Sequence, residues 1–544
     1  MNIALARLSR RILPAVLGVT VVAGCSGSGG TGVAKGSASP APSISAAPSP
    51  SASPTPSASP TPTVKPTGAD DPALKSFYGQ QIAWAPCADD PETKNVDEST
   101  FQCGTAHVPL DYANPATDTI DLALVRKPAA KQDQRLGSLF FNPGGPGGSG
   151  IGEVTNGAAS RFQSLNDRYD LVGFDPRGVG KSTPVHCLDD AARDQWVTED
   201  HPAQAAKGKA LADGCQAKSG KLLPFLGTAD GARDLDVLRG VVGDQKLNFL
   251  GFSYGTYLGS VYAEQFPART GHLVLDGAMD PTQTLLDSDV QQMIGFEGVF
   301  ERWAADCVTH DGCPLGSNPD TAAKKAADFL DGLADNPMTT KDGRQLTASQ
   351  GWTGTLSMLY GSGKSWEYLR NGLDWAMKGH KADYLLDFAD GYNGRDAQGH
   401  YDNSADAYAA ITCADHGALM PTDDQIQQAL QQLHDKAPYL TRHYTKDDLF
   451  DPDCRAWPYR STVQPHQIKA PGSAPILVVG STGDDATPYA WAQNLAAGLP
   501  GAVLLTRDGD GHTGYGKSAC IKSAVDAFLI NGTMPAAGTH CASD

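Results

Sequence analysis

The residue with the clearest chemical potential is Ser253, which lies in the sequence GFSYG at residues 251–255. An apolar run at 247–250 precedes it and a helix-like stretch at 254–265 follows, which is the strand–turn–helix setting of a nucleophile elbow. Glycines on both sides permit a tight turn, so the Ser253 hydroxyl can project beyond the strand. The start of the helix adds positive potential and a free Tyr254 N–H. We interpret Ser253 as a nucleophile for acyl transfer.

A serine hydroxyl needs a base to remove its proton, and the base needs an orienting carboxylate. Two later apolar runs, at 476–479 and 503–506, lead into segments that supply both groups. The first run continues to Asp484 and Asp485, and the second continues to His512. The alternative for His512 is an ordinary histidine in a surface loop. Serine, acid and histidine is the chain order of an α/β-hydrolase triad. Adjacent side chains point in different directions, so only one of the two aspartates can reach the imidazole.

A glycine-rich segment, NPGGPGGSG at residues 142–150, directly follows another apolar run. Its spacing fits the dinucleotide-binding pattern G-x-G-x-x-G, and Asp175 ends the next run, where a ribose-binding acid would stand. However, Pro146 removes an N–H from the phosphate cradle, and an exported chain does not meet nicotinamide cofactors. The same glycines suit a loop whose N–H groups, together with that of Tyr254, stabilise an oxyanion. We favour the oxyanion loop.

From about residue 70, apolar runs alternate with longer amphipathic stretches, which predicts an α/β fold with a mostly parallel sheet and helices on both faces. Helices are expected at 232–242 and 254–265. The strands are expected at 138–142, 169–174, 247–250, 272–275, 476–479 and 503–506.

Between residues 280 and 474 the sequence has no strong strand run. It has helical periodicity instead, at 293–307, 321–333, 366–377 and 424–433. We therefore expect a mainly helical cap at 281–465, inserted between two parts of one core at 70–280 and 466–544. Such a cap would cover the carboxyl ends of the strands, where open α/β sheets bind ligands.

The first 24 residues are typical of a signal peptide, with three arginines followed by an apolar stretch at 12–23. They end before Cys25 in a sequence similar to a lipobox; an ordinary signal peptide with a chance cysteine is the alternative. Residues 25–69 are rich in Ser, Pro and Ala and predict a disordered linker. The body is thus expected outside the cytoplasm, held at the outer face of the cytoplasmic membrane by a lipid on Cys25, secreted, or both.

Cysteine usage agrees with export. Ten of the 11 cysteines remain when Cys25 is set aside, and an even number in an exported chain favours disulfides. Pairing of nearest neighbours would give five local bridges, with Cys307–Cys313 the shortest, but the sequence does not fix the pairing. A formal net charge of -18 argues against nucleic acid as a partner. We expect no metal and no cofactor.

Further motifs complete a family pattern: DPRGVGKS at 175–182, LDG at 275–277 and DDATP at 484–488. With the segments around Ser253 and His512, they make the sequence similar to the exported actinobacterial tripeptidyl aminopeptidases, relatives of prolyl aminopeptidases among the α/β-hydrolase serine peptidases. The resemblance runs from about residue 82 to Cys541. It implies an exported serine exopeptidase that releases short peptides, of tripeptide length, from the free N-terminus of peptide substrates.

The resemblance implies Ser253 as nucleophile and His512 as general base. It selects Asp484 as the orienting acid, because the family's acid stands three residues before the Thr of Thr-Pro. The family usually has Pro directly after this acid, whereas this chain has Asp485. That departure bears on the local geometry and on the pH response.

By the same resemblance, Gly145 and Tyr254 would donate the oxyanion-hole N–H groups, and Thr487 would support the Asp–His pair or serve only as a turn residue. An exopeptidase also needs a counter-charge for the substrate ammonium. Glu297 and Asp415 are the cap acids to test, with a solvated or capping role as the alternative for each. The functional alternatives are an esterase with the same triad and a catalytically silent peptide-binding lipoprotein.

Overall fold

A computed structural model describes residues 68–87, 100–200, 204–379, 381–416, 419–449 and 452–544. The predicted signal peptide, Cys25 and all but the last two residues of the predicted linker lie outside these ranges. Within them, no helix combines the length and hydrophobicity that a membrane span requires.

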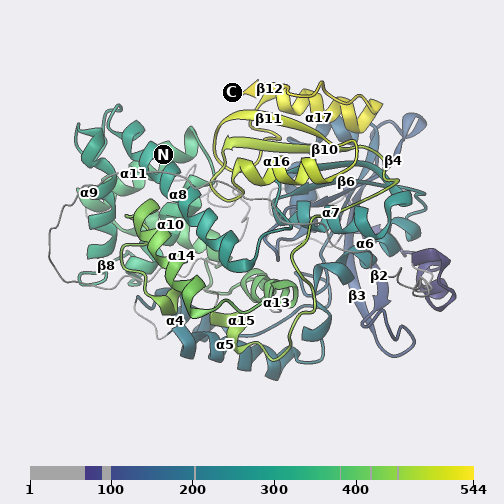
Figure 1. Cartoon of the computed structure of the whole chain (residues 1–544), viewed down its shortest axis with the longest axis horizontal. Helices are drawn as coiled ribbons and strands as arrows, with labels where there is room; N and C mark the ends of the chain where they lie inside the picture. The colour runs from purple at the N-terminus through teal and green to yellow at the C-terminus, as the bar shows by residue number, and fades with distance from the viewer. Residues whose placement is uncertain (1–67, 88–99, 201–203, 380, 417–418, 450–451) are drawn as a thin grey trace, which may run out of the picture.

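The centre of the molecule is a ten-stranded sheet (Figure 1). Neighbours are parallel from β5 to β12, and β1, β2 and β3 add an antiparallel edge. In spatial order the strands are β1 (Ala85–Pro86), β2 (Gln102–Pro109), β3 (Thr119–Lys127), β5 (Tyr169–Phe174), β4 (Gly137–Asn142), β6 (Leu247–Phe252), β7 (Thr270–Asp276), β10 (Ile476–Gly483), β11 (Val503–Asp510) and β12 (His540–Ala542). All six expected strands form, and the edge strands were not expected.

The central strands are continuous apolar runs because both faces of the sheet are covered. Every residue of β4 and β5 is buried. Side chains alternate between two cores, so Phe140 packs on one face while Leu139 and Phe141 pack on the other. One face carries α6 (Thr228–Val241), α7 (Tyr254–Gln265) and α16 (Tyr489–Gly498). The other carries α2 (Gly150–Gly157), α3 (Gln163–Asn166) and α17 (Ala519–Asn531).

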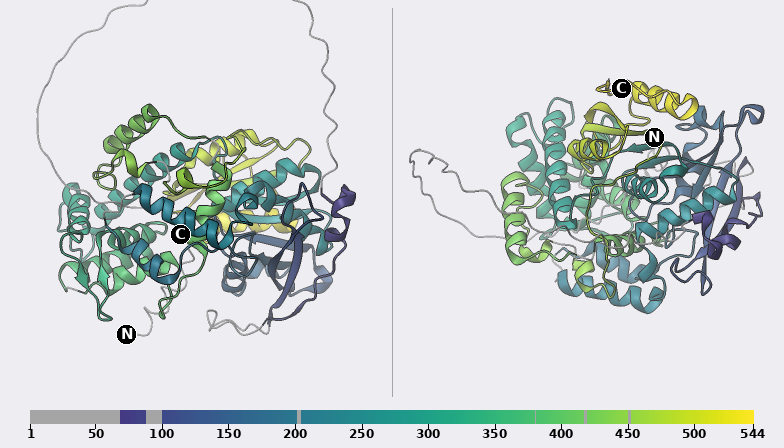
Figure 2. Two further views of the ribbon diagram at one scale, coloured as in Figure 1. Left: turned by 90° about the horizontal axis from the view of Figure 1, so that it is seen from below. Right: turned by 45° about the vertical axis from the view of Figure 1, so that its right-hand side comes forward.

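A third apolar core holds together a group of helices that we call the lid. In Figures 1 and 2 the lid lies beside the sheet, at the end of the molecule away from the antiparallel edge. It contains α8 (Leu285–Cys307), α9 (Pro319–Gly332), α10 (Ala348–Leu359), α11 (Lys364–Met377), α12 (Asp383–Asn393) and α14 (Asp423–Lys436), with a short hairpin of β8 (Met338–Thr339) and β9 (Gln345–Leu346).

Helix α13 (Ser404–His416) belongs to the same inserted stretch of chain but packs into the core under α6 and α7. A disulfide between Cys413 and Cys454 joins it to α15 (Pro452–Ala456). Two further helices, α4 (Asp190–Thr198) and α5 (Gln204–Ser219), lie between β5 and β6 in the chain. The inserted stretch therefore divides into a separate lid and a part, α13 with α15, that packs with the core of the sheet.

Ten cysteines form five disulfides, each between nearest neighbours in the sequence: Cys87–Cys103, Cys187–Cys215, Cys307–Cys313, Cys413–Cys454 and Cys520–Cys541. The predicted local bridges are thus confirmed. Bridges of this number persist in oxidising surroundings, so the body of the protein is extracytoplasmic.

Candidate active site

Ser253 occupies the turn between β6 and α7, with φ 54° and ψ -124°. A positive φ is uncommon for a residue with a side chain, and here the tight turn imposes it. The flanking glycines are required by close contacts of the main chain. A Cβ on Gly251 would lie 2.4 Å from the oxygen of Gly255, and one on Gly255 would lie 2.7 Å from the oxygen of Asn142. The local sequence therefore forms a strained elbow that presents Ser253.

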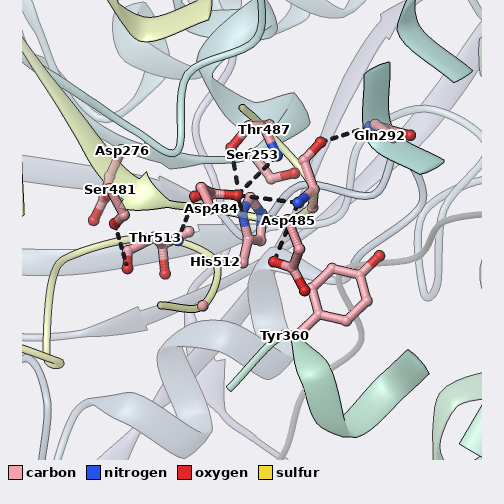
Figure 3. Close-up of polar contacts among 12 residues, drawn as sticks. Ser253, Asp276, Gln292, Tyr360, Ser481, Asp484, Asp485, Thr487, His512 and Thr513 are labelled. Carbon is pink, nitrogen blue, oxygen red and sulfur yellow. Dashed lines mark hydrogen bonds and ion pairs between the residues drawn. The ribbon is translucent and has the colours of Figure 1, made fainter. Parts of the chain in front are cut away.

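His512 and Asp484 form a buried pair beyond the ends of β11 and β10 (Figure 3). The Nδ1 atom of His512 lies 2.8 Å from Oδ1 of Asp484. The Asp484 carboxylate also accepts main-chain N–H groups, from Thr487 at 2.8 Å, Thr513 at 3.0 Å and Ala486 at 3.1 Å. Burial alone would raise the pKa of Asp484, but the His512 charge and these donors hold it below its ordinary value. Asp484 therefore stays ionised.

The other ring nitrogen of His512, Nε2, is buried and has no hydrogen-bond partner among the described residues. Thr487 contributes its hydroxyl as well as its N–H, with Oγ1 3.2 Å from Nδ1 of the imidazole. Asp484 and Thr487 thus fix the ring through one nitrogen and leave Nε2 to accept a proton.

Ser253 and His512 both lie against the peptide unit between Asp276 and Gly277, at the end of β7. The N–H of Ser253 donates to the oxygen of Asp276 at 2.9 Å. A Cβ on the next residue, Gly277, would lie only 3.0 Å from Cε1 of His512. The Asp276 carboxylate in turn accepts the N–H of Gly514 at 2.8 Å, just beyond the histidine. The end of β7 therefore brings the serine turn and the histidine loop together, as Figure 3 shows.

The predicted oxyanion loop lies against the serine turn. A Cβ on Gly144, which has φ 101°, would lie 2.8 Å from Cβ of Ser253 and 3.1 Å from the nitrogen of Tyr254. Only a glycine allows this approach of the loop to the serine turn. Tyr254 opens α7, so its N–H has no acceptor within the helix. The Tyr254 N–H thus follows Ser253 directly, and Gly145 as the second donor stays a prediction.

Helix α8 of the lid contacts the loop that carries the acid. Gln292 donates from Nε2 to the oxygen of Ala486 at 2.8 Å. One turn further on, a Cβ on Gly295 would lie 2.4 Å from the oxygen of Asp485, so the helix and the loop touch through their main chains. The lid therefore braces the acid loop directly.

The end of α10 contacts the loop that carries the histidine. The oxygen of Tyr360 accepts the N–H of His512 at 2.9 Å and the ammonium of Lys517 at 3.0 Å. Lys517 also donates to the oxygen of His512, and burial lowers its pKa to about 8. The Tyr360 ring stands edge-on to the imidazole, with centroids 5.7 Å apart. Lys517 thus links the end of α10, in the lid, to the main chain of His512.

Helix α13 contacts the oxyanion loop. A Cβ on Gly147 would lie 2.5 Å from the oxygen of Ser404, in the first turn of that helix. Three helices of the inserted stretch, α8, α10 and α13, therefore each contact one of the three segments that surround Ser253.

Glu297 and Asp415 are both buried, and each accepts hydrogen bonds from a segment other than the loops around His512. Glu297 accepts the N–H groups of Tyr439 at 3.1 Å and Leu440 at 3.0 Å, inside the lid. Asp415 accepts the N–H of Thr228 at 2.7 Å and its hydroxyl at 2.5 Å, which caps α6 from α13. These contacts match the capping alternative, and a role toward a substrate ammonium stays a prediction for both.

Sequence reasoning missed Tyr360 and Lys517 as supports of the histidine loop. No motif marks them, because one acts through a main-chain oxygen and the other precedes an ordinary helix. Asp276 and Gly277 belong to the LDG motif, which marked them in the sequence. The motif did not show that they lie between the serine turn and the histidine loop. Among the described residues, no group of three or more His, Cys, Asp or Glu side chains is placed to hold a metal.

Comparison with known proteins identifies the family of the chain. The model of a family described as TAP-like protein matches residues 438–541. Serine protease Hip1 of Mycobacterium tuberculosis is 39% identical over 486 residues, covering 85% of this chain and 91% of that protein. Carboxylesterase B of the same species is 37% identical over 479 residues, covering 85% and 90%. Tripeptidyl aminopeptidase of Streptomyces lividans is 32% identical over 490 residues, covering 85% and 86%. The chain therefore belongs to the tripeptidyl aminopeptidase-like family of α/β-hydrolase serine peptidases.

Proposed function

We propose that this protein is an exported serine aminopeptidase that releases short peptides, of tripeptide length, from the free N-terminus of peptide substrates. Ser253 is the nucleophile, His512 the general base and Asp484 the acid that orients it. The observation that carries the proposal is the buried Asp484–His512 pair, at 2.8 Å, beside the strained serine turn. The names of the relatives supply the substrate class.

In the acylation step, Nε2 of His512 takes the proton of the Ser253 hydroxyl as Oγ bonds to the scissile carbonyl carbon. The carbonyl oxygen becomes an oxyanion, which the N–H groups of Gly145 and Tyr254 stabilise. When the intermediate collapses, the carbon–nitrogen bond breaks and the imidazolium gives its proton to the leaving amine. Asp484 stabilises the imidazolium while it exists.

In the deacylation step, water takes the place of the amine. His512 accepts a proton from the water as the water oxygen bonds to the acyl carbon. The N–H groups of Gly145 and Tyr254 again bind the oxyanion. The proton then passes to Oγ of Ser253, the ester bond breaks, and the short peptide leaves with a new carboxylate. Thr487 keeps the ring in position through both steps.

The enclosure of the site supports an exopeptidase. Ser253 is only 8% exposed, and lid and α13 contacts surround it on three segments. A serine enclosed in this way is more accessible to the end of an extended chain than to a folded loop of a protein substrate. This fits the removal of a short N-terminal piece.

Product analysis on oligopeptides tests the proposal. We expect the wild-type protein to release a short peptide from substrates with a free amino terminus, and to lose this activity on the same peptides after N-acetylation. The Ser253→Ala variant should release nothing. Cleavage in the middle of the chain, or equal cleavage of acetylated peptides, would contradict an aminopeptidase.

An esterase is the second candidate, because one relative at 37% identity is named carboxylesterase B and the triad itself does not separate amides from esters. Rapid turnover of simple esters without cleavage of any peptide would favour it. A fluorophosphonate that labels wild type but not Ser253→Ala excludes the silent peptide-binding lipoprotein.

We also propose that the mature chain begins at a lipidated Cys25 and is held at the outer face of the cytoplasmic membrane. The lipobox-like sequence and the extracytoplasmic body support this. The membrane fraction should retain the wild-type protein and lose the Cys25→Ser variant; equal release of both into the medium would contradict the anchor.

A further inference from the structure

The side chain of Tyr254, the residue that follows the nucleophile, begins a buried chain of hydrogen bonds across the helices α7, α6 and α13 (Figure 1). Its hydroxyl is hydrogen-bonded to Oγ1 of Thr228, the first residue of α6. The same oxygen lies 2.5 Å from Oδ2 of Asp415, near the end of α13. The proposed mechanism uses the main chain of Tyr254 and gives no task to the other groups of this hydrogen-bond chain.

The number of protons sets the direction of the hydrogen-bond chain. An ionised carboxylate only accepts, so Thr228 gives its one hydroxyl proton to Asp415, and Tyr254 must then donate to Thr228. Burial raises the pKa of Asp415 to about 7, although both Thr228 donors act to lower it, so this direction holds above that pH. Linked hydrogen bonds in a buried setting polarise one another and hold their groups more firmly than separate bonds would.

Asp415 is itself held by several contacts at the end of α13. Its Oδ1 accepts the N–H of Thr228 at 2.7 Å, and its main-chain oxygen accepts the hydroxyl of Ser461 at 3.1 Å. Two residues earlier, Cys413 is joined to Cys454 by a disulfide. The end of α13 is therefore a fixed point to which the Tyr254 side chain is attached.

The other end of α13 lies against the oxyanion loop. A Cβ on Gly147 would lie 2.5 Å from the oxygen of Ser404, the first residue of the helix. One helix of 13 residues therefore contacts the loop of the predicted donor Gly145 at its start, and holds the side chain of Tyr254 from its end. Both sides of the expected oxyanion hole depend on the placement of α13.

We propose that Thr228 and Asp415 are positioning residues of the catalytic site, which act through the side chain of Tyr254. The hydrogen-bond chain fixes the first residue of α7, and with it the N–H that stabilises the oxyanion. The inference rests on the proposed function. Ser253 has a strained φ of 54°, and such a conformation persists only where its surroundings fix it. The anchored Tyr254 ring is one such restraint, because it keeps the first turn of α7 from relaxing.

Tyr254→Phe and Thr228→Val each remove one hydroxyl and keep the shape of the side chain. The readouts are kcat and KM on a free peptide, the rate of fluorophosphonate labelling of Ser253, and the unfolding temperature, all at a pH where Asp415 is ionised. Loss of a whole oxyanion donor costs about 10²–10³ in kcat, whereas here the donor is loosened and not removed. We expect kcat and the labelling rate each to fall about tenfold, with KM nearly unchanged.

The matched control is Tyr257→Phe, one turn along α7, which removes a hydroxyl outside this hydrogen-bond chain and should keep wild-type values. The double variant Tyr254→Phe/Thr228→Val should lose no more than either single variant, because both changes break the same chain. Additive losses in the double variant would overturn the inference. So would a lower unfolding temperature with unchanged kcat and labelling, which would leave the hydroxyls a role in stability alone.

Asp415→Leu separates the positioning role from that of a counter-charge for the substrate ammonium. A positioning residue lowers kcat and fluorophosphonate labelling together, because both reactions use the oxyanion donor. A counter-charge instead raises KM on free peptides and leaves labelling unchanged, since a fluorophosphonate has no ammonium group, and this result would overturn the inference. If Asp415→Leu does not fold, the two hydroxyl variants decide. Failure of fluorophosphonate to label wild type would instead overturn the proposed function.

Discussion

Asp484 differs from the other acids near the triad in the number and direction of its donors. Four groups converge on its carboxylate, and one of them is Nδ1 of His512 at 2.8 Å. Asp508, by contrast, lies at the exposed edge and contacts His540. The local chain, not the residue type, decides which aspartate orients the base.

Replacing Asp484 by Asn should keep the fold and remove most of the activity. The amide would present an N–H to Nδ1 or favour the wrong tautomer, so kcat should fall by about 10⁴ with little change in KM. Steady-state kinetics on a peptide substrate measure this. Asp508→Asn is the matched control and should retain wild-type kcat; a loss below tenfold in Asp484→Asn would contradict the assignment.

The sequence was sufficient for the residues that follow strands. Ser253, Asp484 and His512 each lie within a few residues of the end of an apolar run, so the carboxyl edge of a parallel sheet brings them together. The sequence was insufficient to predict residues that hold the histidine loop through contacts between distant parts of the chain. Lys517 meets the oxygen of Tyr360 only because a lid helix ends there, and no spacing along the chain reports that contact.

The three segments around the serine are each held by a helix of the inserted stretch. Helix α8 holds the acid loop, α10 ends on the histidine loop, and α13 begins against the oxyanion loop. The contacts are mainly between main chains, and glycines at 295 and 147 make two of them possible. Activity therefore depends on how these helices pack, even though none of them supplies a triad residue.

Gly147→Ala tests this dependence. The residue has φ 99°, and the new methyl group would lie 2.5 Å from the oxygen of Ser404, so either the loop or α13 must move. Displacement of one oxyanion donor typically costs 10²–10³ in kcat, and we expect a loss of about a hundredfold. Kinetics and fluorophosphonate labelling measure it.

The control for Gly147→Ala is Gly152→Ala, in the helix that follows the same loop. A Cβ there would meet only the Ser149 side chain, at 3.6 Å, and Ala favours the helix. Its kcat should match wild type. Equal activity in both variants would show that α13 does not fix the oxyanion loop.

Buried strands and long amphipathic helices were predictable, and half-exposed edges were not. Strand β5 is buried throughout and reads as an apolar run, whereas β2 has exposed and part-buried positions over most of its length. Helix α7 was expected at its observed limits. The start of α8 was expected too late, because its N-terminal turn depends on the Thr284 side chain accepting the N–H of Asp287 rather than on apolar spacing.

The whole molecule combines two cores around the sheet with a third in the lid, and disulfides fix the joins between elements. Cys413–Cys454 closes a separation of 41 residues between α13 and α15. Cys307–Cys313 closes a separation of only 6 at the end of α8. The chain therefore carries one long and one short bridge within the inserted stretch.

Removal of these bridges should destabilise the protein, and the cost should rise with the logarithm of the length of the released loop. Chain-entropy estimates give about 4 kcal/mol for the Cys413–Cys454 bridge and about 2 kcal/mol for Cys307–Cys313. Double Cys→Ser variants of each pair, compared by denaturant unfolding, measure the difference. The longer bridge should also affect kcat, because α13 contacts the oxyanion loop. A larger loss from the shorter bridge would contradict this ranking.

The order of the triad along the chain affects when the enzyme becomes active. The nucleophile is made at residue 253, but its acid and base follow only at 484 and 512 of 544, after the entire lid. Strand β10 must then enter the sheet beside β7, and β11 beside β10. A nascent or truncated chain that stops short of this final segment carries a serine with no base, so proteolytic competence arises only on completion and assembly of the full polypeptide.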